Sequence, residues 1–335
     1  MNPLSRRQFV ATGAVFATAL SAGVAATRRS KVGFLGTTYS HFEEKHKVLS
    51  ASPDWEVVGL SDDDGGGRWN VPTDRLLSAA EVIVIESAVP HHGRDALRAL
   101  AAGRHVHVEK PPASMLDEMR RMVQFAREKN VLLQVGYQWR YHPGFEKILE
   151  AARSGWLGDI FQIRANMHTR LEEDRRAEWA GLPGGSMFEQ GSHLIDPIIR
   201  ILGRPKSVKP FLQRRGHDAL NDNNVAVFEF DKALAIVTNS VWQPNANTHR
   251  AFEVLGTNGT AVLGPIEPAA LTIDLAKATG PYRAGTQTVE LPQYPRYVRD
   301  FADLAAAVRG EKSLPVSLDQ ELLVHEWLLK ACGVE

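Results

Sequence analysis

Residues 31–36 read Lys31-Val32-Gly33-Phe34-Leu35-Gly36, an apolar run that ends in a glycine. This stretch predicts a buried β-strand that leads into a tight turn, and residues 42–49 continue as a predicted helix. A second strand is predicted at 55–60, followed by the acidic run Asp62-Asp63-Asp64. Strand, glycine turn, helix, strand and terminal acidic residue, in this order, are typical of a dinucleotide-binding βαβ unit. The N-terminal part is therefore predicted to be a Rossmann-type parallel sheet domain.

The glycine turn departs from the usual GxGxxG pattern. Gly36 takes the first glycine position, whereas Thr38 and His41 take the second and third. The second glycine normally lets the backbone approach the pyrophosphate, so Thr38 must donate its hydroxyl or hold a cofactor further away. Taken alone, the pattern fits a plain α/β turn equally well. The connection from 62 to 82 is also short and contains the run Gly65-Gly66-Gly67.

Later strands deliver polar side chains to the same edge of the predicted sheet. Residues 81–85 form a continuous apolar strand, and the turn after it contains Ala88 and Pro90. Residues 104–109 form the next strand and place Lys110 directly before two prolines. Ligands bind at the carboxyl ends of parallel strands, so Lys110 is a candidate site residue, with a solvated surface lysine as the structural alternative. The bond that follows Lys110 precedes a proline and can adopt the cis form.

From Asp159 onward the pattern changes to strands separated by Asp, Asn and Gly turns. The strand-like runs are 160–168, 224–230, 233–242, 251–256 and 260–264. Few helices intervene, which predicts a C-terminal α+β domain with a mostly antiparallel open sheet. We expect a signal peptide and short mature N-terminus at 1–30, a dinucleotide-binding domain at 31–150, a substrate and oligomerisation domain at 151–296, and C-terminal helices at 297–335.

A helical segment at 184–203 interrupts this sheet domain and carries the candidate catalytic groups. At about 100° per residue, one narrow polar stripe contains Glu189, His193, Asp196 and Arg200. A carboxylate and an imidazole one turn apart suit proton transfer. Two structural alternatives stay open, because Ser186 and Glu189 can form a capping box and His193 can be an ordinary half-buried histidine. Pro197 predicts a kinked or irregular helix.

Length, charge and cysteine count narrow the class of protein. The 335 residues favour two domains, and the 39 basic residues balance the 39 acidic ones, so no nucleic-acid partner is expected. Cys332 is the only cysteine, which excludes an intramolecular disulfide and a cysteine-based metal cluster. The sequence has no HExxH motif and no clustered His/Asp metal pattern, so no metal is expected.

The N-terminus reads as an export signal. Ser5-Arg6-Arg7-Gln8-Phe9-Val10 precedes a weakly apolar run at 11–22, and small residues at 24–26 suit signal-peptidase cleavage. The order predicts a twin-arginine signal and a periplasmic or otherwise exported protein. The run is too short and too weakly apolar for a membrane span, so none is expected after cleavage. An uncleaved anchor, or a chance Arg-Arg before an amphipathic helix, is the alternative.

Three stretches together resemble the Gfo/Idh/MocA oxidoreductase family. They are Ala101-Ala102-Gly103-Arg104-His105-Val106-His107-Val108-Glu109-Lys110-Pro111, the run from Gly136 to Pro143, and the segment that begins at Gly184. The resemblance runs from about Lys31 to the C-terminal helices. It implies a Rossmann domain followed by a domain whose open sheet forms homodimers or homotetramers. It also implies a nicotinamide cofactor and a sugar, inositol or related polyol as substrate.

The resemblance also implies roles for particular residues. Lys110 would lie near the nicotinamide and the reacting hydroxyl, His193 would be the acid/base, and Glu189 would orient them from a position usually held by aspartate. Asp62 matches the residue that binds the adenosine ribose, which favours NAD over NADP. The expected cofactor contacts are Gly33, Gly36, Thr37, Thr38, Asp62, Ala88, Pro90, Glu109 and Lys110. Polar residues that could serve a hydroxylated substrate, with a structural role as the equal alternative, are Arg140, Tyr141, His142 and His168.

These expectations lead to an NAD(P)-dependent oxidoreductase acting on a secondary hydroxyl of a sugar, polyol or related carbohydrate. His193 would take the hydroxyl proton, Lys110 would stabilise the alkoxide, and hydride would pass to the nicotinamide. Free nicotinamide is scarce outside the cytoplasm, so the cofactor would be retained and recycled in place. A retained cofactor would also permit a glycosidase that works by oxidation, elimination and reduction. The altered glycine turn leaves a cofactor-free sugar-binding protein or lyase as the alternative.

Overall fold

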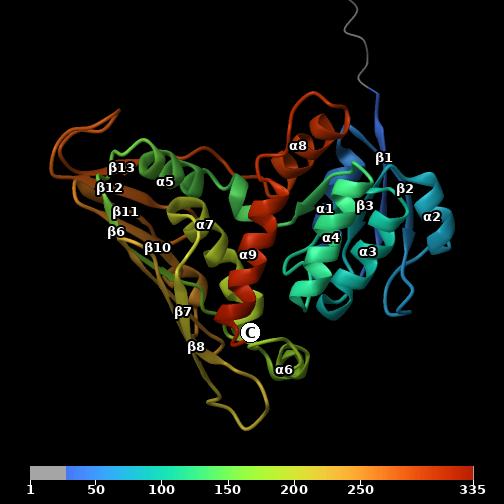
Figure 1. Ribbon diagram of the computed structural model, residues 1–335, viewed down its shortest axis with the longest axis horizontal. Helices are drawn as coiled ribbons and strands as arrows, with labels where there is room; N and C mark the ends of the chain where they lie inside the picture. The colour runs from blue at the N-terminus through green and yellow to red at the C-terminus, as the bar shows by residue number, and fades with distance from the viewer. Residues whose placement is uncertain (1–27, 335) are drawn as a thin grey trace, which may run out of the picture.

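Two β-sheets organise the chain in the computed structural model, which describes residues 28–334 (Figure 1). The predicted export signal, with its cleavage region at 24–26, lies outside these residues. One sheet has five strands and belongs to the N-terminal domain, and the other has eight strands and belongs to the C-terminal domain. Both sheets, and the parallel and mostly antiparallel character predicted for them, are confirmed.

The five-stranded sheet is parallel and has the order β2-β1-β3-β4-β5. Its strands are β1 (Ser30–Leu35), β2 (Trp55–Ser61), β3 (Val82–Ile85), β4 (His105–Val108) and β5 (Leu133–Val135). The helices of this domain are α1 (Phe42–Ala51), α2 (Thr73–Ala79), α3 (His92–Ala101) and α4 (Leu116–Glu128). All four residues of β3 are buried, as a central strand of a parallel sheet requires. Helix α2 lies within the short, glycine-rich connection between β2 and β3.

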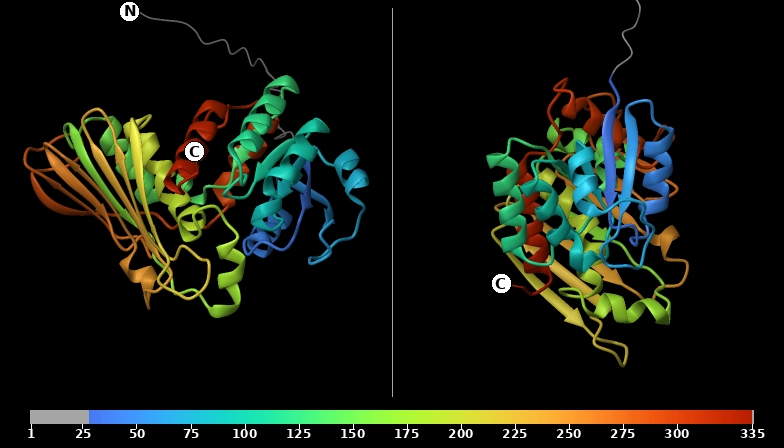
Figure 2. Two further views of the ribbon diagram at one scale, coloured as in Figure 1. Left: turned by 60° about the horizontal axis from the view of Figure 1, so that its bottom comes forward. Right: turned by 90° about the vertical axis from the view of Figure 1, so that its right-hand side faces the viewer.

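The eight-stranded sheet has the order β13-β12-β11-β10-β6-β9-β8-β7 and is antiparallel except for the β6–β9 pair. Its strands are β6 (Ile160–Asn166), β7 (Ser207–Gln213), β8 (Asn223–Glu229), β9 (Leu234–Ser240), β10 (Ala251–Gly256), β11 (Gly259–Leu263), β12 (Leu271–Leu275) and β13 (Gly285–Val289). The sequence did not predict β7, β12 or β13. Helices α5 (Pro143–Arg153) and α7 (Ser192–Leu202) lie on one face of the sheet, and the opposite face is open (Figure 2).

The two C-terminal helices connect the halves of the molecule. Helix α8 (Val298–Val308) returns to the first sheet, where Phe301 and Leu304 share a buried apolar cluster with Phe34 and Trp55. Helix α9 (Leu318–Ala331) contacts α4 of the first domain as well as α7 and β7 of the second. Both helices were predicted, but their packing partners were not. Within residues 28–334, none of the helices has the length and apolar character needed to span a bilayer.

Candidate active site

The segment predicted to carry the chemistry begins with an irregular turn. Residues Met187–Gly191 form a π-helical turn, η3, that leads into α7, and Pro197 lies within that helix. The capping box does not form, because the Ser186 hydroxyl donates to Asn221 O at 3.1 Å and to Asn239 Oδ1 at 2.8 Å. π-helical turns frequently occur at functional sites. The carboxylate in this turn is therefore available to groups from the other domain.

Glu189 joins the two domains through Lys110 and Tyr39. Lys110 lies just after β4, and its bond to Pro111 is cis. Its Nζ lies 2.5 Å from Glu189 Oε1. The Tyr39 hydroxyl donates to the same oxygen at 2.7 Å. All three side chains are buried. The glycine turn, the end of β4 and the π turn thus meet at one carboxylate oxygen.

Tyr39 was missed by sequence reasoning, although it sits inside the glycine turn that the sequence singled out. The pattern GxGxxG assigns no role to this position, so the signal was its place directly after Thr38. The Lys110 ammonium also lies 5.5 Å from the centre of the Tyr39 ring. Tyr39 therefore contacts both of the charged candidate catalytic residues.

His193 is buried, and the centre of its ring lies 5.0 Å from that of Trp139, with the two ring planes tilted by 43°. Burial, together with the positive charge of Lys110, holds the pKa of His193 well below its usual value. The ring is therefore neutral near pH 7 and able to accept a proton. Nδ1 has no hydrogen-bond partner within the described part of the chain, and Glu189 Oε2 has none either. Unsatisfied buried polar atoms of this kind are costly unless a ligand bonds to them.

A second buried cluster lies behind the site. Lys45 Nζ is 2.6 Å from Glu86 Oε1 and 3.2 Å from His107 Nε2, and it also bonds to Glu109. Glu86, His107 and Glu109 have the spacing of metal ligands, but the Lys45 ammonium occupies the position between them. Glu109, an expected cofactor contact, is fully buried and is used here instead. The cluster therefore fixes β3, β4 and α1 relative to one another.

The glycine turn brings two strand ends together and exposes two hydroxyls. Gly36 has φ +79°, and a Cβ added there would overlap the backbone of Ser87, so the two strand ends approach as closely as glycine allows. The backbone N–H groups of Gly36, Thr37 and Tyr39 are already bonded, to Ser61 O, Asp62 Oδ2 and Glu86 O. Thr38 and Ser40 are exposed at the carboxyl edge of the sheet, so their hydroxyls are the groups of this turn left to face a phosphate.

The ribose side of the same site is covered by the glycine-rich loop. Asp62 Oδ2 accepts from both the backbone N and the Oγ1 of Thr37, each at 3.2 Å. A Cβ added at Gly67 would overlap these same atoms, so the loop lies directly on them. Asp62 directly follows β2, where a ribose-binding acid is expected, and Gly67 covers its carboxylate.

Three other expected cofactor contacts differ in their surroundings. Gly33 lies within β1, and a Cβ there would overlap Leu76, so this glycine allows α2 to pack on the sheet and does not face the site. Ala88 is half-buried and Pro90 is exposed at the turn after β3, on the edge where they were expected.

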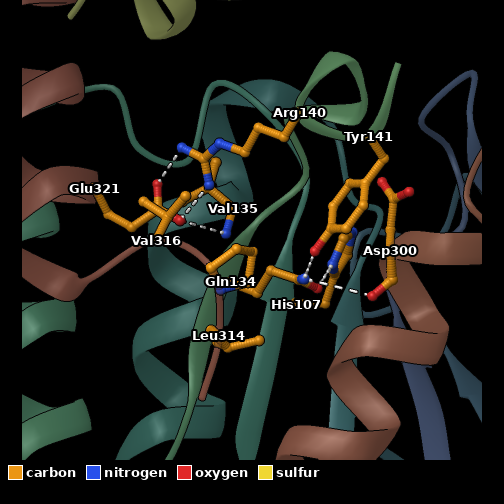
Figure 3. A pocket seen from close by; sticks show the side chains of 10 residues that line it. His107, Gln134, Val135, Arg140, Tyr141, Asp300, Leu314, Val316 and Glu321 are labelled. Atoms are coloured by element: carbon orange, nitrogen blue, oxygen red, sulfur yellow. Dashed lines mark hydrogen bonds and ion pairs between the residues drawn. The ribbon is translucent and has the colours of Figure 1, made fainter. Parts of the chain in front are cut away.

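The side chain of Arg140, an expected substrate contact, is engaged in a buried ion-pair network. Its guanidinium donates to Glu321 at 2.6 and 2.7 Å (Figure 3). It also donates to Asp196 at 2.8 and 3.1 Å. Tyr141 Oη accepts from Gln134 Nε2 at 3.3 Å. Both side chains are therefore engaged by the fold, Arg140 with α7 and α9 and Tyr141 with β5.

The two expected substrate histidines differ. His142 caps α5, with Nδ1 accepting from Gly144 N at 3.1 Å and Nε2 lying 3.1 Å from Ile266 O. Its ring is fully used by the fold. His168 is half-buried, and its Nδ1 has no partner within residues 28–334. Of the four predicted substrate contacts, His168 is the one whose polar ring atom is left for a ligand.

A doubly wound N-terminal sheet with a lysine at a strand end, facing a helix with a neutral histidine, defines the class of two-domain dinucleotide-dependent oxidoreductases. Comparison with known families agrees. Residues 30–137 match the oxidoreductase family with an NAD-binding Rossmann fold, and residues 145–262 match the GFO/IDH/MocA C-terminal domain. The chain belongs to the Gfo/Idh/MocA family.

Individual relatives match only part of the chain. Scyllo-inositol 2-dehydrogenase (NADP(+)) of Bacillus subtilis is 30% identical over 132 residues, covering 39% of this chain and 37% of that enzyme. Trans-1,2-dihydrobenzene-1,2-diol dehydrogenase of Macaca fuscata is 30% identical over 148 residues, covering 44% of each. The matches thus span about half or less of the curated relatives. A protein of gentamicin A biosynthesis, solved in complex with NAD, shares the fold with a TM-score of 0.75 at 22% identity, covering 91% of this chain and 93% of that one.

Proposed function

We propose that the protein is an NAD-dependent oxidoreductase acting on a secondary hydroxyl of a sugar, polyol or related carbohydrate, with NADP as the alternative cofactor. The observation that carries the proposal is the meeting of Lys110, Glu189 and a neutral His193 at the carboxyl edge of a Rossmann sheet. Relatives named as dehydrogenases of an inositol and of a dihydrodiol act on compounds with secondary hydroxyls, which supports this substrate class.

The residues divide the reaction among them. A bound nicotinamide dinucleotide supplies the hydride acceptor. His193, kept neutral by burial, accepts the hydroxyl proton at its unpartnered Nδ1 or at Nε2. Lys110 stabilises the negative charge that develops on the substrate oxygen. Glu189 and Tyr39 hold the Lys110 ammonium in place, which is the orienting role expected for the carboxylate.

The turn at Gly36 and the carboxylate of Asp62 would hold the dinucleotide. Asp62 favours NAD because its negative charge would repel a 2′-phosphate. Gly67 lies against Asp62, and the loop that carries it would close over the adenosine after binding, which supports retention of the cofactor. The same contact supports the competing proposal of a cofactor-free sugar-binding protein or lyase, because Gly67 covers the Asp62 carboxylate in this structure. An internally recycled cofactor would also allow the oxidation, elimination and reduction sequence of a glycosidase.

Bound nucleotide distinguishes these proposals. The purified protein should release NAD or NADP on denaturation, seen by mass spectrometry, and should gain absorbance near 340 nm with borohydride. Added NAD should raise the melting temperature if the site is empty. If the protein releases no nucleotide on denaturation and is not stabilised by added NAD or NADP, the oxidoreductase proposal is ruled out. His193→Ala should abolish turnover and leave nucleotide binding intact, and surviving activity would exclude His193 as the base.

We further propose that the protein is exported by the twin-arginine pathway. The Arg6-Arg7 pair before the apolar run supports this proposal. Replacement of both arginines by lysine should leave the protein in the cytoplasm, as shown by cell fractionation; unchanged export would contradict the proposal.

A homodimer or homotetramer formed through the open sheet face is also proposed. Phe211 of β7 and Leu234 of β9 are exposed large apolar residues of this sheet, which supports it. Light scattering should show an oligomer for the wild type and a monomer for the Phe211→Ser, Leu234→Ser double variant. A monomeric wild type would contradict the proposal.

A further inference from the structure

Arg250, directly before β10, carries a positive charge that no acidic side chain neutralises. Its Nε donates to the backbone O of His168 at 3.1 Å. Within residues 28–334 the guanidinium forms no salt bridge. Glu267 is the acidic residue that raises the pKa of Arg250, but both of its oxygens already bond to Arg296, at 3.2 and 2.5 Å. The Nη groups of Arg250 are therefore left to pair with something outside the chain.

Arg250 lies at the end of the second sheet that carries the π-helical turn η3. Its Nε bond to His168 O places the guanidinium just after β6, which pairs with β9, and Asn239 of β9 donates to Met187 Sδ of η3 at 3.2 Å. The Arg250 charge also contributes to lowering the pKa of both His193 and His168. His193 Nδ1 and His168 Nδ1 are buried polar atoms without a partner in the described part of the chain. These unpartnered groups are carried by neighbouring elements, since α7 contacts β6 and follows the turn whose Glu189 meets Lys110.

Arg250 lacks the acidic partner that Lys110 and Arg296 each have. Lys110 is matched by Glu189, and Arg296 is matched by Glu267. His193 is neutral, so Arg250 is the unmatched charge in this group of described residues. A half-buried guanidinium without a counter-ion is unfavourable, and a carboxylate can satisfy it through two parallel hydrogen bonds. One unmatched guanidinium suits a monoanion better than a phosphate dianion, which usually needs more cationic groups.

We propose that Arg250 binds a carboxylate of the substrate, so that the carbohydrate is a sugar acid, such as a uronate or an aldonate. The proposal rests on the proposed function, since it names the substrate class of that same site. His168 would bond to a neighbouring hydroxyl through its unpartnered ring nitrogen. The carboxylate would fix the sugar so that a hydroxyl elsewhere on it faces His193 and Lys110.

Matched acid and neutral ligands test this assignment by isothermal titration calorimetry on the full chain. The pairs are methyl β-D-glucuronoside against methyl β-D-glucoside, D-galacturonate against D-galactose, and D-gluconate against D-glucitol. The acid of at least one pair should bind at least tenfold more tightly than its neutral partner. Arg250→Met should remove that difference, and Arg250→Lys should keep part of it. Arg299→Met, which removes an exposed arginine paired with Glu146, should bind like the wild type.

Equal affinity within every pair, no binding of any acid, or an unchanged preference in Arg250→Met would each overturn the assignment. Melting curves establish that each variant is folded, and Arg250→Lys provides the comparison if Arg250→Met is not. Nucleotide binding and turnover are measured separately. If the protein binds sugar acids but neither contains nor responds to a nicotinamide nucleotide, the redox proposal fails and the Arg250 site stands. If it turns over only neutral polyols, with a nucleotide, the Arg250 site fails and the redox proposal stands.

Discussion

The hydroxyl of Tyr39 lies 2.7 Å from Glu189 Oε1, across 150 residues of sequence and across the boundary between two sheets. Lys110 Nζ contacts the same oxygen. One carboxylate oxygen therefore connects Tyr39 of the glycine turn to the proposed catalytic lysine, Lys110. This arrangement gives the Glu189 side chain two partners that the usual aspartate would reach from one methylene further back.

Removing the Tyr39 hydroxyl should weaken catalysis more than folding. In Tyr39→Phe, Glu189 loses one of its two donors, and a hydrogen bond to a charged group contributes about 1.5–3 kcal/mol, which corresponds to roughly tenfold or more in kcat. The measurement is steady-state turnover with a polyol or sugar acid identified by thermal shift. Tyr294→Phe is the matched control, because that hydroxyl donates to Gln138 O at 2.6 Å in the same region. Equal turnover in both variants would contradict an orienting role for Tyr39.

The His193 ring should remain neutral through the physiological pH range. Burial and the Lys110 charge lower its pKa well below the ordinary 6.5, so its NMR signals should not titrate between pH 6 and 8. The signals are assigned by comparison with His193→Gln. A midpoint near 6.5 would show that the ring is exposed to solvent and would contradict the buried geometry.

Lys45 should be one of the most sensitive positions for stability. Lys45→Met leaves the Glu109 carboxylate buried without its cation and removes a hydrogen-bond donor to Glu86, and breaking a buried ion pair in this way costs about 3–5 kcal/mol. The free energy of unfolding is measured by urea denaturation. Lys147→Met removes an exposed pair with Glu150 and should change stability by less than about 1 kcal/mol. Similar losses in both variants would mean that the cluster does not stabilise the fold.

Glu86 should make the fold less stable as the pH rises. Burial raises the pKa of Glu86 from 4.5 to about 8, so the folded state favours its protonated form. The stabilisation that this raised pKa contributes is fully present below pH 4.5 and is lost as the pH rises to about 8. Between pH 5 and pH 8 the wild type should therefore lose more stability than Glu86→Gln, which cannot ionise. The free energy of unfolding is measured by urea denaturation at each pH. The same pH dependence in both proteins would contradict this assignment.

Arg140 should matter for stability and not for substrate affinity. Arg140→Met strands Glu321 and Asp196 in the interior, so a loss of about 3–5 kcal/mol is expected. Arg299→Met removes an arginine that also forms two bonds to one carboxylate, but at the surface, and should cost less than about 1 kcal/mol. If Arg140→Met keeps its stability and loses affinity for a carbohydrate, the original assignment of Arg140 to the substrate is restored.

The sequence alone determined the features that depend on local pattern. The apolar runs and the glycine at 36 define the parallel sheet, because buried strands and their turns have short-range signatures. The run that ends in Lys110 and the segment containing His193 identified the two catalytic candidates. Pro197 predicted an irregular helix, since a proline cannot complete the helical hydrogen-bond pattern. The irregular turn in the structure is Met187–Gly191, which lies before the His193 carbonyl that Pro197 affects.

Only the tertiary structure decided which side chains are free to act. Arg140 and Glu109 looked like ligand contacts, but each is neutralised by a residue far away in the sequence. Tyr39 gained its role, and Arg250 its unmatched charge, from what lies opposite them after folding. A polar residue is available for chemistry only if no other residue satisfies it, and long-range packing decides that pairing.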